Sequence, residues 1–145
     1  MTDQKFLNIV NDINNISEKL YVISEKEERN FHIHNLNNQQ QVILNLIINH
    51  PDFSPSDIAK TMNISKSAIS QQLYKLEESG YIEKYKLESD KRLVRISLKE
   101  KGIEYKQQSE KYYEELLNKY KSQLSLKEVT DIRDSLEKLL QVINS

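Results

Sequence analysis

The stretch Ser54 to Gly80, SPSDIAKTMNISKSAISQQLYKLEESG, decides the fold because it holds two short amphipathic segments around a tight turn. Ser54 can cap the first helix, and Pro55 then occupies the first helical position, where its missing N–H costs nothing. Asp57 follows in the first turn, where an acid suits the positive end of the helix dipole. These signals predict a helix over 55–62.

The second half of the stretch predicts a second helix directly after a turn at 63–65. Ser65 is placed as its N-cap, and Gly80 stands where a left-handed residue closes a helix. Ile69, Leu73 and Leu76 recur at helical spacing and predict the buried side of a helix over 66–79. Two short helices around such a turn indicate a helix-turn-helix.

The opposite side of the second helix is polar, and the first acids of this helix, Glu77 and Glu78, come only at its far end. In a helix-turn-helix this helix lies in the major groove, where Gln71 can pair with adenine and the serines can bond to bases or phosphates. Lysines and helix N-caps suit phosphates, which give affinity without sequence information. The predicted DNA contacts of the two helices are Ser54, Ser56, Ser65, Lys66, Ser67, Ser70, Gln71, Tyr74 and Lys75.

The periodicity then changes from helical to alternating. Residues 81–86 and the alternating Val94, Ile96 and Leu98 predict two strands joined by a polar loop, which together form a wing. Arg92 at its tip is placed to enter a minor groove, and we expect Asp90 to pair with Arg92 or a neighbour and fix the loop. The predicted contacts of the wing are Lys84, Lys86, Asp90, Lys91, Arg92 and Arg95.

Outside this region the chain predicts more helices. One spans about 3–29, one 39–49 with Val42, Ile43, Leu46 and Ile47 inward, a long one follows Gly102, and the last spans 126–145. The first and last carry narrow apolar seams at spacings of three and four, which need a partner and predict burial against a second copy of the chain. The seam residues assigned to dimerisation are Phe6, Ile9, Ile13, Ile16, Val129, Ile132, Leu136, Leu139 and Ile143.

Composition excludes several functional classes. The net charge is −1, but residues 54–102 carry +3, so the positive charge is concentrated in the winged region. The chain has no cysteine, two glycines, no catalytic motif and no span-length apolar stretch. We therefore expect no enzymatic activity, no cofactor and a cytoplasmic protein that associates with the nucleoid when bound to DNA. His32 and His34 form the one metal-like pair, but too few partners accompany them to predict a metal site.

The run SPSDIAKTMNISKSAISQQLYKLEESGYIEKYKLESDKRLVRISLKEKG resembles the core of the MarR family of bacterial transcription regulators. The resemblance implies a homodimer, with two winged lobes binding a palindromic operator. The family's Asp-x-Arg wing motif is matched at Asp90 and Arg92. A frequent arginine of the first wing strand is Lys84 here, and Leu98-Lys99 replaces the usual Leu-Thr before the long helix.

The expected fold is therefore mainly α with a small β-hairpin, a winged helix-turn-helix over 37–102 flanked by dimerisation helices over 1–36 and 103–145. The resemblance implies a regulator, most often a repressor released by a small aromatic or anionic ligand. The candidate ligand residues are Tyr21, Arg29, His32 and Tyr112. The alternative is a winged-helix module that binds protein instead of DNA.

Overall fold

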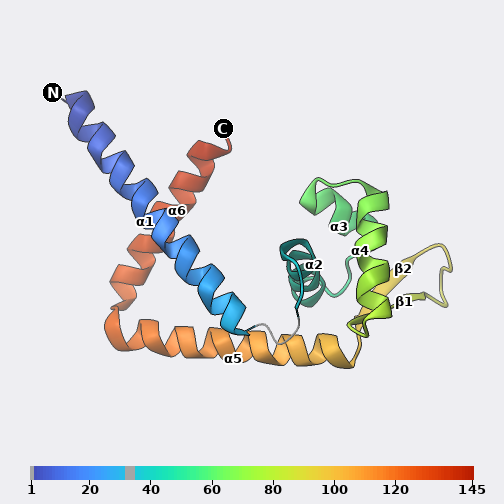
Figure 1. Cartoon of the computed structure of the whole chain (residues 1–145). Coiled ribbons are helices and arrows are strands. Elements are labelled where there is room, and N and C mark those ends of the chain that lie inside the picture. The colour runs from blue at the N-terminus through green and yellow to red at the C-terminus, as the bar shows by residue number, and fades with distance from the viewer. Residues whose placement is uncertain (1, 32–34) are drawn as a thin grey trace. The chain divides into compact units, whose positions relative to one another are not determined.

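The computed structural model describes residues 2–31 and 35–145, and it is mainly helical with one antiparallel hairpin (Figure 1). The expected fold class is therefore confirmed. The elements of the described residues are α1 (Thr2–Phe31), α2 (Asn38–Asn49), α3 (Pro55–Met62), α4 (Lys66–Glu78), β1 (Ile82–Lys86), β2 (Val94–Leu98), α5 (Glu100–Gln123) and α6 (Leu126–Ile143).

The helix-turn-helix forms where the capping signals placed it. The Ser54 Oγ accepts the Asp57 N–H at 3.2 Å at the start of α3, and the Ser65 Oγ accepts the Ala68 N–H at 3.1 Å at the start of α4. Asn63 closes α3 with a φ of 53°, in the left-handed region that asparagine tolerates. Gly80 follows α4 with a φ of 86°, as predicted.

The core of the winged region comes from one face of each element. α3 contacts α4, α4 contacts β1, and α3 also contacts β2. The side chains at the centre are almost fully shielded from solvent, which supplies the main driving force for folding this small lobe. They are Ile43, Leu44, Ile47, Ile58, Ala59, Ile69, Leu73, Leu76, Tyr81, Ile82 and Ile96.

The inward face of α2 differs from the prediction. Val42 is 45% exposed, whereas Leu44 is fully buried. The cause is a polar residue that points inward: Gln41 is 8% exposed, and its side-chain amide donates to the Leu36 carbonyl at 3.0 Å. This hydrogen bond satisfies the buried amide, so Gln41 can take an inward position beside Ile43, Leu44 and Ile47 while Val42 stays exposed.

In the hairpin, residues that are hydrogen-bonded to the opposite strand alternate with residues that are not. β1 pairs with β2 so that Lys84 lies opposite Ile96 and Tyr85 opposite Arg95. In line with this register, the Lys99 N–H donates to the Tyr81 carbonyl at 2.9 Å and the Leu87 N–H to the Leu93 carbonyl at 3.2 Å. Because paired residues alternate along an antiparallel strand, the N–H groups of the even-numbered residues of β1 point away from β2.

The long helix α5 begins at Glu100, so Gly102 lies in its first turn rather than before it. The Lys101 N–H donates to the Gly80 carbonyl at 3.3 Å, so part of the helix start is satisfied by the turn after α4. This helix thus starts earlier than the local pattern predicted, and a contact between residues distant in sequence satisfies one of its first N–H groups.

The chain divides into two compact units, Met1–Gly102 and Ile103–Ser145. The seams of the terminal helices are mostly exposed in the single chain: Phe6 in α1 is 71% exposed, Leu136 in α6 is 58% exposed, and α6 has no buried residue. Within the described residues, no helix is both long and apolar enough to cross a bilayer.

Candidate nucleic-acid interface

The outer face of α4 presents the polar side chains that the sequence assigned to DNA. Lys66, Ser67, Ser70, Gln71 and Tyr74 are exposed, and the Tyr74 side chain is 58% exposed. The apolar residues of α4 are buried on its other side. Such a face offers hydroxyl, amide and ammonium groups of the kind that pair with base edges, and base contact by these residues remains a prediction.

The hydroxyl of the N-cap Ser54 is already engaged by a neighbouring acid. The Ser54 hydroxyl donates to Asp57 Oδ2 at 3.0 Å, and the Ser54 N–H donates to the same oxygen at 2.9 Å. These hydrogen bonds are the main cause that holds the pKa of Asp57 below its usual value, with Arg95 adding a smaller electrostatic contribution. A phosphate contact by the Ser54 hydroxyl, which stays a prediction, must therefore compete with Asp57.

The turn of the helix-turn-helix borders a shallow depression with two lysines. Lys60 of α3 and Lys66 of α4 line it, together with Ser56 and the cap Ser65, which are also exposed. The depression lies at the N-terminal end of α4, where free backbone N–H groups and the helix dipole favour an anion. Lys60 was not among the contacts predicted from the sequence. Its position in the last helical turn of α3, just before the turn of the helix-turn-helix, could have indicated it.

The wing loop holds its arginine through a bidentate contact. Arg92 Nε donates to Asp90 Oδ1 at 3.1 Å, Arg92 Nη2 donates to Asp90 Oδ2 at 3.2 Å, and the Arg92 N–H also donates to Oδ1 at 3.0 Å. The Arg92 side chain is nonetheless 91% exposed, and these bonds lower the pKa of Asp90. The expected pairing of Asp90 is confirmed, and it orients a cation that remains open to solvent.

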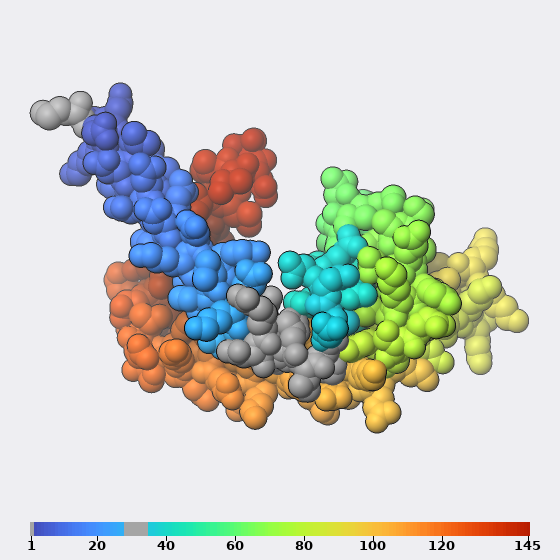
Figure 2. All heavy atoms as spheres, viewed as in Figure 1, coloured from blue at the N-terminus to red at the C-terminus, as the bar shows by residue number. Residues whose placement is uncertain are grey.

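The other basic residues of the wing lie on two faces of the hairpin. Arg95 shares one face with Tyr85, its cross-strand neighbour, which is 45% exposed. Lys84 and Lys86 alternate onto the opposite face. Figure 2 shows the loop of the hairpin, which includes the exposed Lys91, protruding beyond α4. Tyr85 is a candidate contact that the sequence reasoning missed, although its alternation with Lys84 and Lys86 could have indicated it.

The candidate ligand residues are described only in part. Tyr21 is 63% exposed on α1, and Tyr112 of α5 lies edge-on to Tyr113 with ring centroids 5.8 Å apart. His32 and the Arg29 side chain lie outside the described residues, as does His34. No group of three or more metal-ligating side chains occurs in the described part of the chain. The ligand site therefore stays a prediction.

Together, α3, the turn, α4 and the hairpin define a winged helix-turn-helix protein. Residues 36–94 match the sequence model of the MarR family, so this segment of the chain is similar to that family. The resemblance stated from the sequence is confirmed.

Relatives and solved structures agree with this assignment. YwhA of Bacillus subtilis, an uncharacterised HTH-type transcriptional regulator, is 37% identical over 67 residues, which cover 46% of this chain and 48% of YwhA. The chain thus spans about half the length of that relative and 63% of a second HTH-type regulator from the same organism.

Two solved structures share the fold. FabT of Streptococcus pneumoniae, solved in complex with DNA, superposes with a TM-score of 0.78 at 23% identity, covering 96% of this chain and 97% of FabT. S. aureus MepR bound to ethidium bromide superposes with a TM-score of 0.65 at 24% identity, covering 88% of this chain and 95% of MepR.

Proposed function

We propose that this chain is a homodimeric transcriptional regulator that binds DNA sequence-specifically and acts as a repressor at a palindromic operator. In each lobe α4 enters the major groove, and the wing loop reaches the adjacent minor groove through Arg92. The observation that carries the proposal is the combination of an exposed, acid-free outer face of α4 from Lys66 to Tyr74 and an exposed arginine oriented by Asp90.

Charge supports this reading. Residues 54–102 carry a net charge of +3, although the whole chain carries −1. Lys60 and Lys66 border the depression at the start of α4, where a phosphate of the DNA backbone would also meet free N–H groups. FabT, which shares the fold, was solved in complex with DNA.

The exposed seams of α1 and α6 support the dimer. A soluble monomer rarely leaves a continuous row of large apolar side chains open to water, yet the α6 residues Ile132, Leu136 and Ile143 are each about half exposed or more. A second copy of the chain would cover matching seams by two-fold symmetry. A symmetric pair of lobes would read half-sites about 34 Å apart, which is one turn of DNA.

Release by a small aromatic or anionic ligand completes the proposal. MepR, with the same fold, was solved with the aromatic cation ethidium, and a further structural neighbour, PefR of Streptococcus agalactiae, was solved with heme. A regulator of this kind needs neither an enzymatic activity nor a cofactor of its own. It would act in the cytoplasm, on the nucleoid.

The deciding experiment measures binding of the purified full-length chain to a fluorescent duplex from its own promoter region, at several salt concentrations. We expect nanomolar to micromolar binding that weakens steeply with salt, because several phosphates are neutralised per lobe. Arg92→Ala should weaken binding at least tenfold. Duplex binding that is absent at low salt, or insensitive to salt, would overturn the proposal and favour a protein-binding module.

A further inference from the structure

The C-terminal end of α4 makes a contact with the wing that joins the two DNA-reading elements. Glu77 Oε2 accepts the backbone N–H of Lys84 at 2.9 Å, in a partly buried position. Lys84 is the middle residue of β1. Its N–H is one of those that point away from β2, so the hairpin itself supplies no partner for it.

Glu77 lies on the same side of α4 as residues of its outer face. Ser70, Tyr74 and Glu77 recur at spacings of four and three, so they lie on one stripe of the helix. The first two belong to the outer face proposed to meet the major groove, and Glu77 continues the stripe to the first wing strand. One helix face therefore serves both the proposed base contacts and the attachment of the wing.

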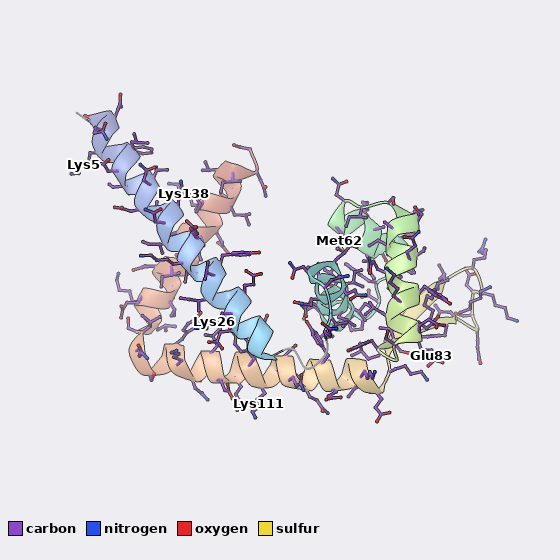
Figure 3. The ribbon with its side chains drawn as sticks, in the orientation of Figure 1. Lys5, Lys26, Met62, Glu83, Lys111 and Lys138 are labelled. Carbon is purple, nitrogen blue, oxygen red and sulfur yellow. The ribbon has the colours of Figure 1, made fainter. Side chains whose placement is uncertain are left out.

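A hydrogen bond from a backbone N–H to a carboxylate is stronger than one to a neutral acceptor. It fixes a point of the β1 backbone, not a mobile side chain, relative to α4. Figure 3 shows the base of the hairpin, marked by Glu83, beside the C-terminal end of α4. Glu83 itself pairs with Lys99, with Nζ and Oε2 3.1 Å apart, so it does not compete for the Lys84 N–H.

We propose that Glu77 is a positioning residue, which accepts the Lys84 N–H and thereby sets the angle at which the wing, and with it Arg92, meets DNA when α4 lies in the major groove. This inference rests on the proposed DNA binding. Glu77 touches no DNA in this scheme, and as an acid it would by charge alone oppose binding. Its contribution is transmitted through the wing.

The test is a double-mutant cycle of Glu77→Ala and Arg92→Ala, read as affinity for the promoter duplex. We expect Glu77→Ala to weaken binding about tenfold in the wild-type background and less than about twofold in the Arg92→Ala background, because the Arg92 side chain that this contact is proposed to place is then absent. Glu77→Gln keeps an acceptor oxygen and should bind within about threefold of wild type. Glu78→Ala is the matched control, because it removes an exposed acid from the adjacent position and should not weaken binding.

Three outcomes of the binding measurements would overturn the proposal: wild-type affinity for Glu77→Ala, an equal loss in both backgrounds, or Glu77→Gln as weak as Glu77→Ala. Amide hydrogen exchange of Lys84 in the free wild-type protein gives a readout that needs neither DNA nor a folded variant. We expect the Lys84 amide to be protected, and rapid exchange would exclude the contact. Wild-type protein that fails to bind DNA while its Lys84 amide is protected would contradict the proposed function and leave the contact standing.

Discussion

Gly102 lies directly against the backbone of Tyr81: a Cβ atom added at Gly102 would come 2.2 Å from the Tyr81 carbonyl oxygen. Real Cβ atoms do not approach a backbone oxygen so closely, and this carbonyl already accepts the Lys99 N–H at 2.9 Å. The first turn of α5 can therefore dock on the turn after α4 only because residue 102 has no side chain.

Gly102→Ala should therefore destabilise the protein by about 2–3 kcal/mol, since the backbone has to shift to admit the methyl group. Gly80→Ala is the matched control: its φ of 86° makes alanine strained, but the nearest atom to its Cβ is a flexible lysine carbon at 3.8 Å. That variant should lose only about 1 kcal/mol. Urea denaturation followed by circular dichroism measures the free energy of unfolding of both variants. Equal losses of stability would contradict the close approach of Gly102 to Tyr81 as the cause.

Asp90→Ala should weaken DNA binding about fivefold, because it releases the bidentate hold on Arg92 that fixes the guanidinium. Removing an acid near DNA would by itself strengthen binding, so the sign of the effect separates orientation from charge. Glu88→Ala removes the same charge from an exposed position of the same loop and should bind as well as wild type or better. Fluorescence anisotropy with a labelled duplex measures the affinity of each variant. Tighter binding by Asp90→Ala than by wild type would refute the role of Asp90 in orienting Arg92.

Asp57 should make the stability of the lobe depend on pH at the acid end. Its hydrogen bonds with Ser54 lower its folded-state pKa, so this stabilisation is fully present above the ordinary carboxylate value of about 4 and is lost as the pH falls through the lower folded value. The melting temperature of Asp57→Asn should therefore be lower than that of the wild type at pH 6. The difference between the two melting temperatures should become smaller towards pH 2. A difference that stays constant over this range would exclude the carboxylate as the cause.

Ile132→Glu combined with Leu136→Glu should destroy the proposed dimer, because two charges would enter a buried apolar seam. We expect a monomer in sedimentation velocity, or unfolded protein. Lys138→Gln, at an exposed position of the same helix outside the predicted seam, should stay dimeric. Likewise, removal of residues 126–145 should give insoluble or unfolded protein, and a wild-type chain that sediments as a monomer would contradict the dimer itself.

Local signals predicted the parts of the fold that depend on neighbouring residues. Ser54, Ser65 and Gly80 act within one helical turn of their own positions, so the sequence located both helices of the motif and the turn between them. The Asp90–Arg92 pair is equally local, two residues apart, and was expected as one of the pairings open to Asp90.

The features that the sequence did not predict involve contacts between residues more than one helical turn apart in the chain. The first turn of α5 carries the Lys101 bond to Gly80, and the inward Gln41 donates to the Leu36 carbonyl. The Glu77–Lys84 hydrogen bond requires the hairpin to fold back onto α4. No periodicity in the sequence encodes such pairs, because each depends on the packed geometry.

The occupied N–H of Lys84 also bears on self-association through β-strands. β1 is five residues long, and its free edge exposes backbone donors only at alternate positions, of which the central one is already taken by Glu77. A foreign strand arriving at this edge would find no continuous ladder, and short, interrupted edges are how proteins avoid growing into larger sheets. The β1 edge of the hairpin thus offers little to the strand of another molecule.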